Sequence, residues 1–263
     1  NYFSESKIEL TPFSHFLIFF GEGMEKSNLS PISQEKKMSL VGHMEELRRR
    51  LIICILTILA CALFSYFYSD RILAILKRPF PHSLVFITPQ EPFIITMKIA
   101  LFGGIIFALP MIIYQVWQFV SSGLKKKEKK YLLFYTPFSL LLFLGGASFA
   151  YFLVIPIGLR FLLGFGSSYL QPMISISKYL SFITLMIFAF GIVFELPLVF
   201  LLLVRMGIVS PQFLAKKRKV FIIAIFVLAA ILTPPDVFTQ ILLAVPLLIL
   251  YEVSILLTKI VPH

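Results

Sequence analysis

The sequence predicts an all-α polytopic membrane protein, with six transmembrane helices in a curved, cup-like bundle, both termini in the cytoplasm and the last two helices short. Three observations predict this fold class. The 263 residues are 59% apolar and only 14% charged, whereas soluble domains are about a quarter charged. The apolar residues form long charge-free runs, and Lys and Arg gather between alternate runs. A lipid bilayer is therefore the expected solvent of this chain.

Six apolar runs follow one another along the chain. Four of them contain no charged residue, namely 51–68, 99–124, 131–159 and 220–235. The runs 179–204 and 237–257 contain one acid each, Glu195 and Glu252. Only helices and closed barrels satisfy all backbone polar groups in lipid, and the runs lack the alternation of barrel strands. Each run is therefore predicted to be a helix.

The last two runs are expected to form a short helical hairpin. The 16 residues of 220–235 would rise about 24 Å as a helix, against a hydrocarbon thickness of about 30 Å. Residues 233–236, TPPD, separate this run from the next. Two successive prolines and an acid favour a tight turn.

The distribution of Lys and Arg predicts the orientation. With the N-terminus inside, the inner segments hold 18 of the 24 Lys and Arg residues, and the outer segments hold six. Cytoplasmic loops carry an excess of these residues, so both termini are expected in the cytoplasm. The six outer residues include Lys98, which directly precedes the second run.

Prolines within or at the ends of the runs predict curved helices. Each proline removes a backbone hydrogen bond and permits a kink. Proline is also ordinarily frequent in membrane helices, so the cup-like curvature is a hypothesis. The prolines concerned are Pro110, Pro137, Pro156, Pro197 and Pro246.

Residues 1–37 are predicted to be a flexible or non-native extension that precedes a membrane domain over 38–263. The apolar stretch 12–20 is too short to span a bilayer, and no positively charged region precedes it as in a signal peptide. Residues 24–37 are rich in Ser, Lys and Glu. These features set the extension apart from the six runs.

The motifs of several enzyme classes are absent. The four histidines lie outside the charge-free runs, where a membrane haem would need its ligands, and no Cys and His cluster has the spacing of a zinc site. No nucleotide-binding glycine pattern occurs. We therefore expect no enzymatic activity, no cofactor and no metal. The basic residues lie between membrane runs and not on one soluble face, so nucleic acid is not an expected partner.

A small-solute secondary transporter or channel is the main alternative function. Transporters usually contain repeated halves and several polar groups inside the membrane. This chain has no clear internal repeat, and Glu195 is the only acid well inside a run. A purely structural scaffold is a third possibility.

Five motifs resemble those of the TatC family, in order along the chain. Residues 43–51 (HMEELRRRL) are similar to the family pattern H-x-x-E-L-R-x-R-L, and 110–119 (PMIIYQVWQF) to P-x-x-x-Y-Q-x-W-x-F. Residues 149–152 (FAYF), 190–197 (FGIVFELP) and 232–240 (LTPPDVFTQ) match three further family motifs.

The resemblance implies a receptor and core subunit of the twin-arginine translocase. Such a subunit has six helices and no ATPase, and it lies in the bacterial cytoplasmic (inner) membrane. It binds twin-arginine signal peptides of folded cargo and assembles as a hetero-oligomer with small single-span Tat subunits of the TatA and TatB type. Transport would be driven by the proton-motive force.

The resemblance places the signal contact on two acids, Glu46 and Glu128. A guanidinium presents a planar fork that matches a carboxylate. The residues alone leave other roles open, because Glu46 could pair with Arg50 one helical turn away, and Glu128 could neutralise the lysines around it. The five lysines of 125–130 would repel an incoming arginine pair, so we expect the weaker contact at Glu128.

Six further residues complete the predicted site. His43 and Arg48 are expected to orient the N-terminal segment beside the signal peptide. Glu195 is predicted to contact the signal or a partner helix inside the membrane, although a structural acid facing the bundle interior is the alternative. Gln240 and Tyr151 are assigned to the same intramembrane polar contacts. Asp236 is assigned there too, or to a turn or cap of the last helix.

Overall fold

The computed structural model describes residues 40–80, 83–122, 129–164, 173–233 and 236–260. Over these ranges the chain is almost entirely helical, and the one β feature among them is an isolated bridge between Val85 and Ser175. The all-α fold is therefore confirmed. The elements are α2 (Leu40–Tyr66), α3 (Ser69–Lys77), α4 (Glu91–Ser122), α5 (Lys129–Phe149), the π-helical turn η2 (Ala150–Val154), α6 (Ile155–Leu163), α7 (Ile176–Phe194), α8 (Leu196–Arg205), α9 (Pro211–Lys216), α10 (Arg218–Leu232) and α11 (Val237–Ile260).

Within the described residues, all six predicted runs are mainly helical, but the helices differ in length. Four segments of the described chain are long and apolar enough to cross a membrane, and a fifth forms if α2 and α3, bent by 85° at residues 67–68, are counted as one. Helix α10 has only 15 residues, so it is short, as predicted. The six-span count, the orientation and the cup-like curvature stay predictions.

The prediction that the last helix is short was wrong. Helix α11 has 24 residues, which corresponds to a length of about 36 Å. The predicted run ended at Leu257, two residues before Lys259, but the helix continues to Ile260. A lysine near a helix end can extend its charged group towards the interface, so it does not stop the helix.

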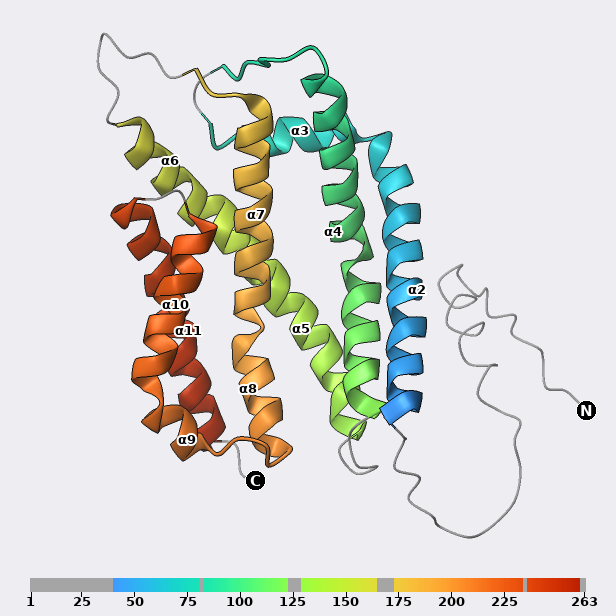
Figure 1. The fold of residues 1–263 in the computed structure, drawn as a ribbon, viewed down its shortest axis with the longest axis vertical. Coiled ribbons are helices and arrows are strands. Elements are labelled where there is room, and N and C mark those ends of the chain that lie inside the picture. The colour runs from blue at the N-terminus through green and yellow to red at the C-terminus, as the bar shows by residue number, and fades with distance from the viewer. Residues whose placement is uncertain (1–39, 81–82, 123–128, 165–172, 234–235, 261–263) are drawn as a thin grey trace, which may run out of the picture. The chain divides into compact units, whose positions relative to one another are not determined.

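Helices α2 and α4 pack closely side by side (Figure 1). Gly104 of α4 makes this possible, because a Cβ atom there would lie 2.6 Å from the Cα atom of Ala62. Helix α5 packs against α7, and α8 and α10 both pack against α11. The most deeply buried side chains come mainly from α7 and α11, and include Phe190, Ile183 and Tyr251.

Prolines interrupt two of the long segments. Helix α7 ends at Phe194 and α8 begins at Leu196, directly before Pro197, which cannot donate a backbone hydrogen bond. The π-helical turn Ala150–Val154 likewise lies just before Pro156, and such turns are frequent at functional or irregular sites. The first interruption leaves Glu195 at the junction of two helices.

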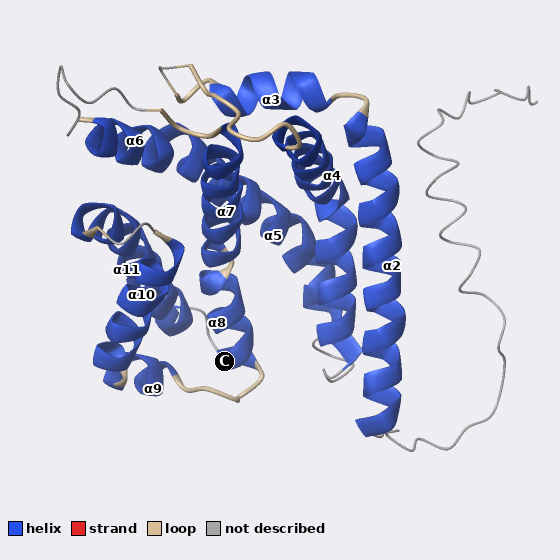
Figure 2. Cartoon of the chain, turned by 45° about the horizontal axis from the view of Figure 1, so that its top comes forward, coloured by secondary structure: helices blue, strands red, loops and turns tan. Residues whose placement is uncertain are grey.

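Helix α3 lies across one end of the bundle, where α4 and α7 begin (Figure 2). The Tyr179 hydroxyl donates to the carbonyl oxygen of Leu76 at 2.9 Å. Val85 and Ser175 form the bridge between the segments that precede α4 and α7. These contacts connect parts of the chain that lie far apart in sequence.

The Glu91 carboxylate links the same two segments. Its Oε2 atom accepts backbone N–H groups of Ile87 at 2.5 Å and Thr88 at 3.4 Å. Its Oε1 atom accepts the Ser175 hydroxyl and the backbone N–H of Ser177, the latter at 3.2 Å. Glu91 is buried, and all four donors lie at the helix starts.

The predicted start of the second helix, directly after Lys98, was too late in the sequence. Helix α4 begins at Glu91, so Lys98 is in its second turn. The Lys98 ammonium donates to the hydroxyls of Ser177 at 3.1 Å and Ser181 at 3.0 Å. A charged side chain that donates to hydroxyls of a neighbouring helix does not end its own helix. The boundaries of a charge-free run in the sequence cannot reveal such a contact.

Candidate functional site

Glu46 accepts a guanidinium in this structure. The Oε1 atom of Glu46 lies 2.9 Å from Nε and 2.5 Å from Nη2 of Arg50. The third contact of this guanidinium crosses to α4, where Nη1 donates to Oε1 of Gln115 at 3.0 Å. The Glu46 and Arg50 side chains are only 17% and 22% exposed, and Gln115 is buried. The pair that helix spacing allowed is thus part of an interhelical cluster.

His43 and Arg48, the two predicted neighbours of Glu46, have different environments. The His43 ring stacks on Phe119 of α4 with 4.4 Å between centroids, so it ties the start of α2 to the end of α4. Arg48 is exposed. Glu128, the second predicted signal-binding acid, lies outside the described residues.

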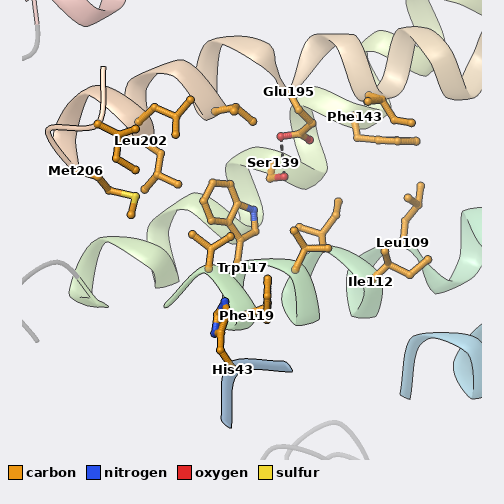
Figure 3. Close-up of a pocket in the computed structure, with 17 residues that line it drawn as sticks. His43, Leu109, Ile112, Trp117, Phe119, Ser139, Phe143, Glu195, Leu202 and Met206 are labelled. Carbon is orange, nitrogen blue, oxygen red and sulfur yellow. Dashed lines mark hydrogen bonds between the residues drawn. The ribbon is translucent and has the colours of Figure 1, made fainter. Parts of the chain in front are cut away.

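A pocket of about 650 Å³ extends from His43 to Glu195 (Figure 3). His43 comes from α2, and α4 supplies the largest share of the wall, including Trp117 and Phe119. The rest of the wall comes from α5, α7, α8 and the residues that directly follow α7 and α8. The lining is almost wholly apolar, with Ser139 and Glu195 as a polar pair. A cavity with these properties suits an apolar segment that carries few polar groups.

Glu195 is only partly satisfied. The Ser139 hydroxyl donates to its Oε2 atom at 2.8 Å, and Figure 3 shows the two side chains pointing toward each other. The Oε1 atom is buried and has no hydrogen-bond partner within the described part of the chain. A buried polar atom without a partner is costly, and this one lies in the wall of the pocket.

The other three predicted intramembrane residues lie away from this pocket. Asp236 caps α11, because its carboxylate accepts the Thr239 backbone N–H at 2.7 Å and the Thr239 hydroxyl at 2.5 Å. The Gln240 amide donates to the carbonyl oxygen of Phe226 in α10 at 3.1 Å. The Tyr151 hydroxyl donates to the carbonyl oxygen of Ile75 in α3 at 2.6 Å. The structure does not bring these side chains together with Glu195.

Gln115 and Ser139 were not among the predicted site residues. Gln115 belongs to the motif run 110–119, and a buried amide in an apolar helix is the signal that could have identified it. Ser139 lies in a charge-free run with no distinguishing neighbour, so only the packing of α5 against α7 reveals its partner. Among the described residues, no three or more His, Cys, Asp or Glu side chains form a group that could hold a metal ion.

Comparisons with known proteins agree in one family. The family model for Sec-independent protein translocase protein (TatC) matches residues 42–246. The Sec-independent protein translocase protein TatC of Carboxydothermus hydrogenoformans is 46% identical over 86% of this chain and 95% of the relative. That of Aquifex aeolicus is 43% identical over 84% of this chain and 95% of the relative. A crystal structure of the twin-arginine translocase receptor TatC in DDM has a TM-score of 0.77 and 43% identity, over 83% of this chain and 100% of that chain.

Proposed function

The chain belongs to the TatC family, and we propose that it is the subunit that binds twin-arginine signal peptides, with Glu46 as the acceptor for a signal arginine. It is a multi-pass membrane protein and a core subunit of the twin-arginine translocase. We further propose which residues bind the signal, where each part of the signal lies and which partners complete the complex.

The observation that carries the proposal is the guanidinium held at Glu46. Two N–H groups of one guanidinium lie within 2.9 Å of the Glu46 carboxylate, in surroundings that are largely protected from water. Charge-assisted hydrogen bonds of this kind contribute about 1.5–3 kcal/mol each. Even two of them fall short of the roughly 8 kcal/mol of micromolar binding, so a second contact region is required.

The apolar pocket is our candidate for that second region. Its His43 and Phe119 end lies one helical turn from Glu46 in α2. A signal peptide whose arginine is bound at Glu46 would therefore place its following apolar stretch in the pocket. Glu195 and Ser139 at the far end would accept a polar group of the signal, or of a single-span partner helix that enters the same pocket.

The remaining parts of the function follow from the family. We propose Glu128 as the second and weaker arginine contact, with His43 and Arg48 orienting the signal. The membrane is the bacterial cytoplasmic (inner) membrane, both termini are cytoplasmic, and the driving force is the proton-motive force. The partners are folded cargo proteins and small single-span Tat subunits, in a hetero-oligomer.

A site-specific crosslink tests the proposal. Met44 and Leu63 are both strongly exposed residues of α2, and they lie about 28 Å apart along the helix. A photocrosslinker at position 44, within one helical turn of Glu46 along α2, should capture a twin-arginine signal peptide, and one at position 63 should not. Equal capture at both positions, or capture at position 63 alone, would contradict the placement of the signal at Glu46.

A further inference from the structure

We propose that Arg50 is an internal competitor of the signal arginine, which occupies Glu46 while no signal is bound and must leave before a signal can bind. The inference rests on the proposed role of Glu46. It adds an autoinhibitory contact to the site and assigns Gln115 as the group that holds Arg50 when it has left Glu46.

The contacts of Arg50 are those that an incoming arginine would need. Both Nε and Nη2 point at Oε1 of Glu46, and this edge of a guanidinium is the one that forms fork-like pairs with carboxylates. A signal arginine that forms such a fork needs both oxygens of the Glu46 carboxylate, and Arg50 occupies Oε1. The signal arginine must therefore displace Arg50 from this oxygen.

Gln115 makes the exchange feasible. The Nη1 atom of Arg50 donates to Gln115 at 3.0 Å, and this amide comes from α4 and is buried. Arg50 can therefore rotate away from Glu46 and keep one hydrogen bond within the bundle. Without such an acceptor, a partly buried guanidinium would lose all of its partners during the exchange, which is costly.

Arg50 also stabilises the receptor when no signal peptide is bound. A partly buried carboxylate with no cation nearby is unfavourable, and Arg50 supplies the cation until a signal arrives. The affinity of every ligand for Glu46 is then reduced by the fraction of receptor in which Glu46 is accessible. If Arg50 occupies Glu46 for about nine-tenths of the time, this reduction is about tenfold.

Because competition lowers the affinity of all ligands by one factor, it leaves their ratio unchanged. A peptide with two lysines in place of the two arginines would be weakened as much as the native signal. Arg50 therefore sets the threshold that a signal must exceed, while the fork geometry of Glu46 sets the preference for arginine over lysine. This separation distinguishes a competitor from a residue that determines specificity.

The experiment measures binding of a synthetic twin-arginine signal peptide and its twin-lysine version to the full chain in lipid nanodiscs. The variants are Arg50→Met, which removes the guanidinium, and Arg50→Lys, which keeps the charge but loses the fork. Arg49→Met and Arg49→Lys are matched controls, because Arg49 is exposed on the same helix turn. We expect Arg50→Met to tighten binding of both peptides about tenfold, Arg50→Lys about threefold, and the Arg49 variants less than twofold.

Two outcomes would overturn the competitor. Weaker peptide binding in both Arg50 variants would mean that Arg50 positions Glu46, and unchanged binding would mean that the signal does not use the same oxygen. Arg50→Lys keeps the charge, so it provides the result if Arg50→Met does not fold, as judged by its melting temperature. Glu46→Gln is measured in parallel, because unchanged peptide binding in that variant would contradict the proposed function itself and not the competitor alone.

Discussion

Glu91 and Glu195 are both acids in long apolar segments, but their surroundings differ. Glu91 accepts four donors, of which three are backbone N–H groups, at the starts of α4 and α7. Glu195 accepts one, from Ser139, and its second oxygen is buried without a partner in the described part of the chain. A pocket of about 650 Å³ lies beside Glu195. The same side chain thus has two different environments.

We interpret Glu91 as a structural acid, and we propose that Glu195 is a binding acid. A carboxylate whose oxygens are all occupied holds two segments together and offers nothing to a ligand. A carboxylate with an unoccupied oxygen in an apolar pocket is costly to bury, and a donor from another molecule would remove that cost. We therefore expect substitutions of Glu91 to affect stability and substitutions of Glu195 to affect transport.

The largest expected effect is on stability, in Glu91→Gln. The amide nitrogen cannot accept the hydrogen bonds that one carboxylate oxygen receives, so two donors near α4 or α7 lose their acceptor. We expect the melting temperature in detergent to fall by about 5–10 °C, and Glu45→Gln, an exposed acid in α2, to leave it unchanged. Equal melting temperatures for the two variants would show that the Glu91 contacts do not hold the segments.

The next effect is on transport, in Glu195→Gln. The change keeps the shape of the side chain and removes its charge, so stability should change little. Export of twin-arginine cargo should fall about tenfold, as expected for the loss of one charge-assisted contact. Glu252→Gln is the control, because Glu252 is a half-exposed acid that pairs with Arg218 on the bundle surface. If both variants export cargo equally well, the pocket acid has no role in binding.

The smallest effects come from the two serine donors. Ser139→Ala removes the one donor described for Glu195 and should destabilise the protein by about 1.5–3 kcal/mol. Ser175→Ala leaves Glu91 with three donors, so neither carboxylate oxygen loses its last partner, and it should cost about 1 kcal/mol, which is typical for the loss of a helix cap. Chemical denaturation of both variants measures this order, and a larger loss in Ser175→Ala would reverse the comparison.

The sequence predicted the helical segments well because charge-free runs report directly on the lipid environment. It missed the true ends of helices, since Lys98 and Lys259 are charged but satisfied or near an interface. It also gave no warning of the Glu91 cluster, in which residues 84 and 86 positions apart meet. Contacts between distant loops leave no periodic pattern in a sequence.

The sequence could predict those parts of the site that depend on a single unusual residue. Glu195 is the only acid well inside a predicted run, and it lies in the pocket. The pairing of Glu46 with Arg50 followed from helix spacing as one of two alternatives. The contribution of Gln115 did not, because it depends on how α2 packs against α4. For Asp236 the sequence left a turn or cap of the last helix open beside a polar contact, and in the structure its carboxylate accepts the Thr239 backbone N–H at the start of α11.

The central claim is that the Glu46 carboxylate binds the signal arginine, and export by Glu46→Ala tests it most directly. Cells that produce this variant should insert it into the membrane at the normal level and export no twin-arginine cargo. Glu45→Ala, which changes the exposed acid beside it, should export cargo normally. A normal export rate in Glu46→Ala, with the protein inserted at the normal level, would contradict the account.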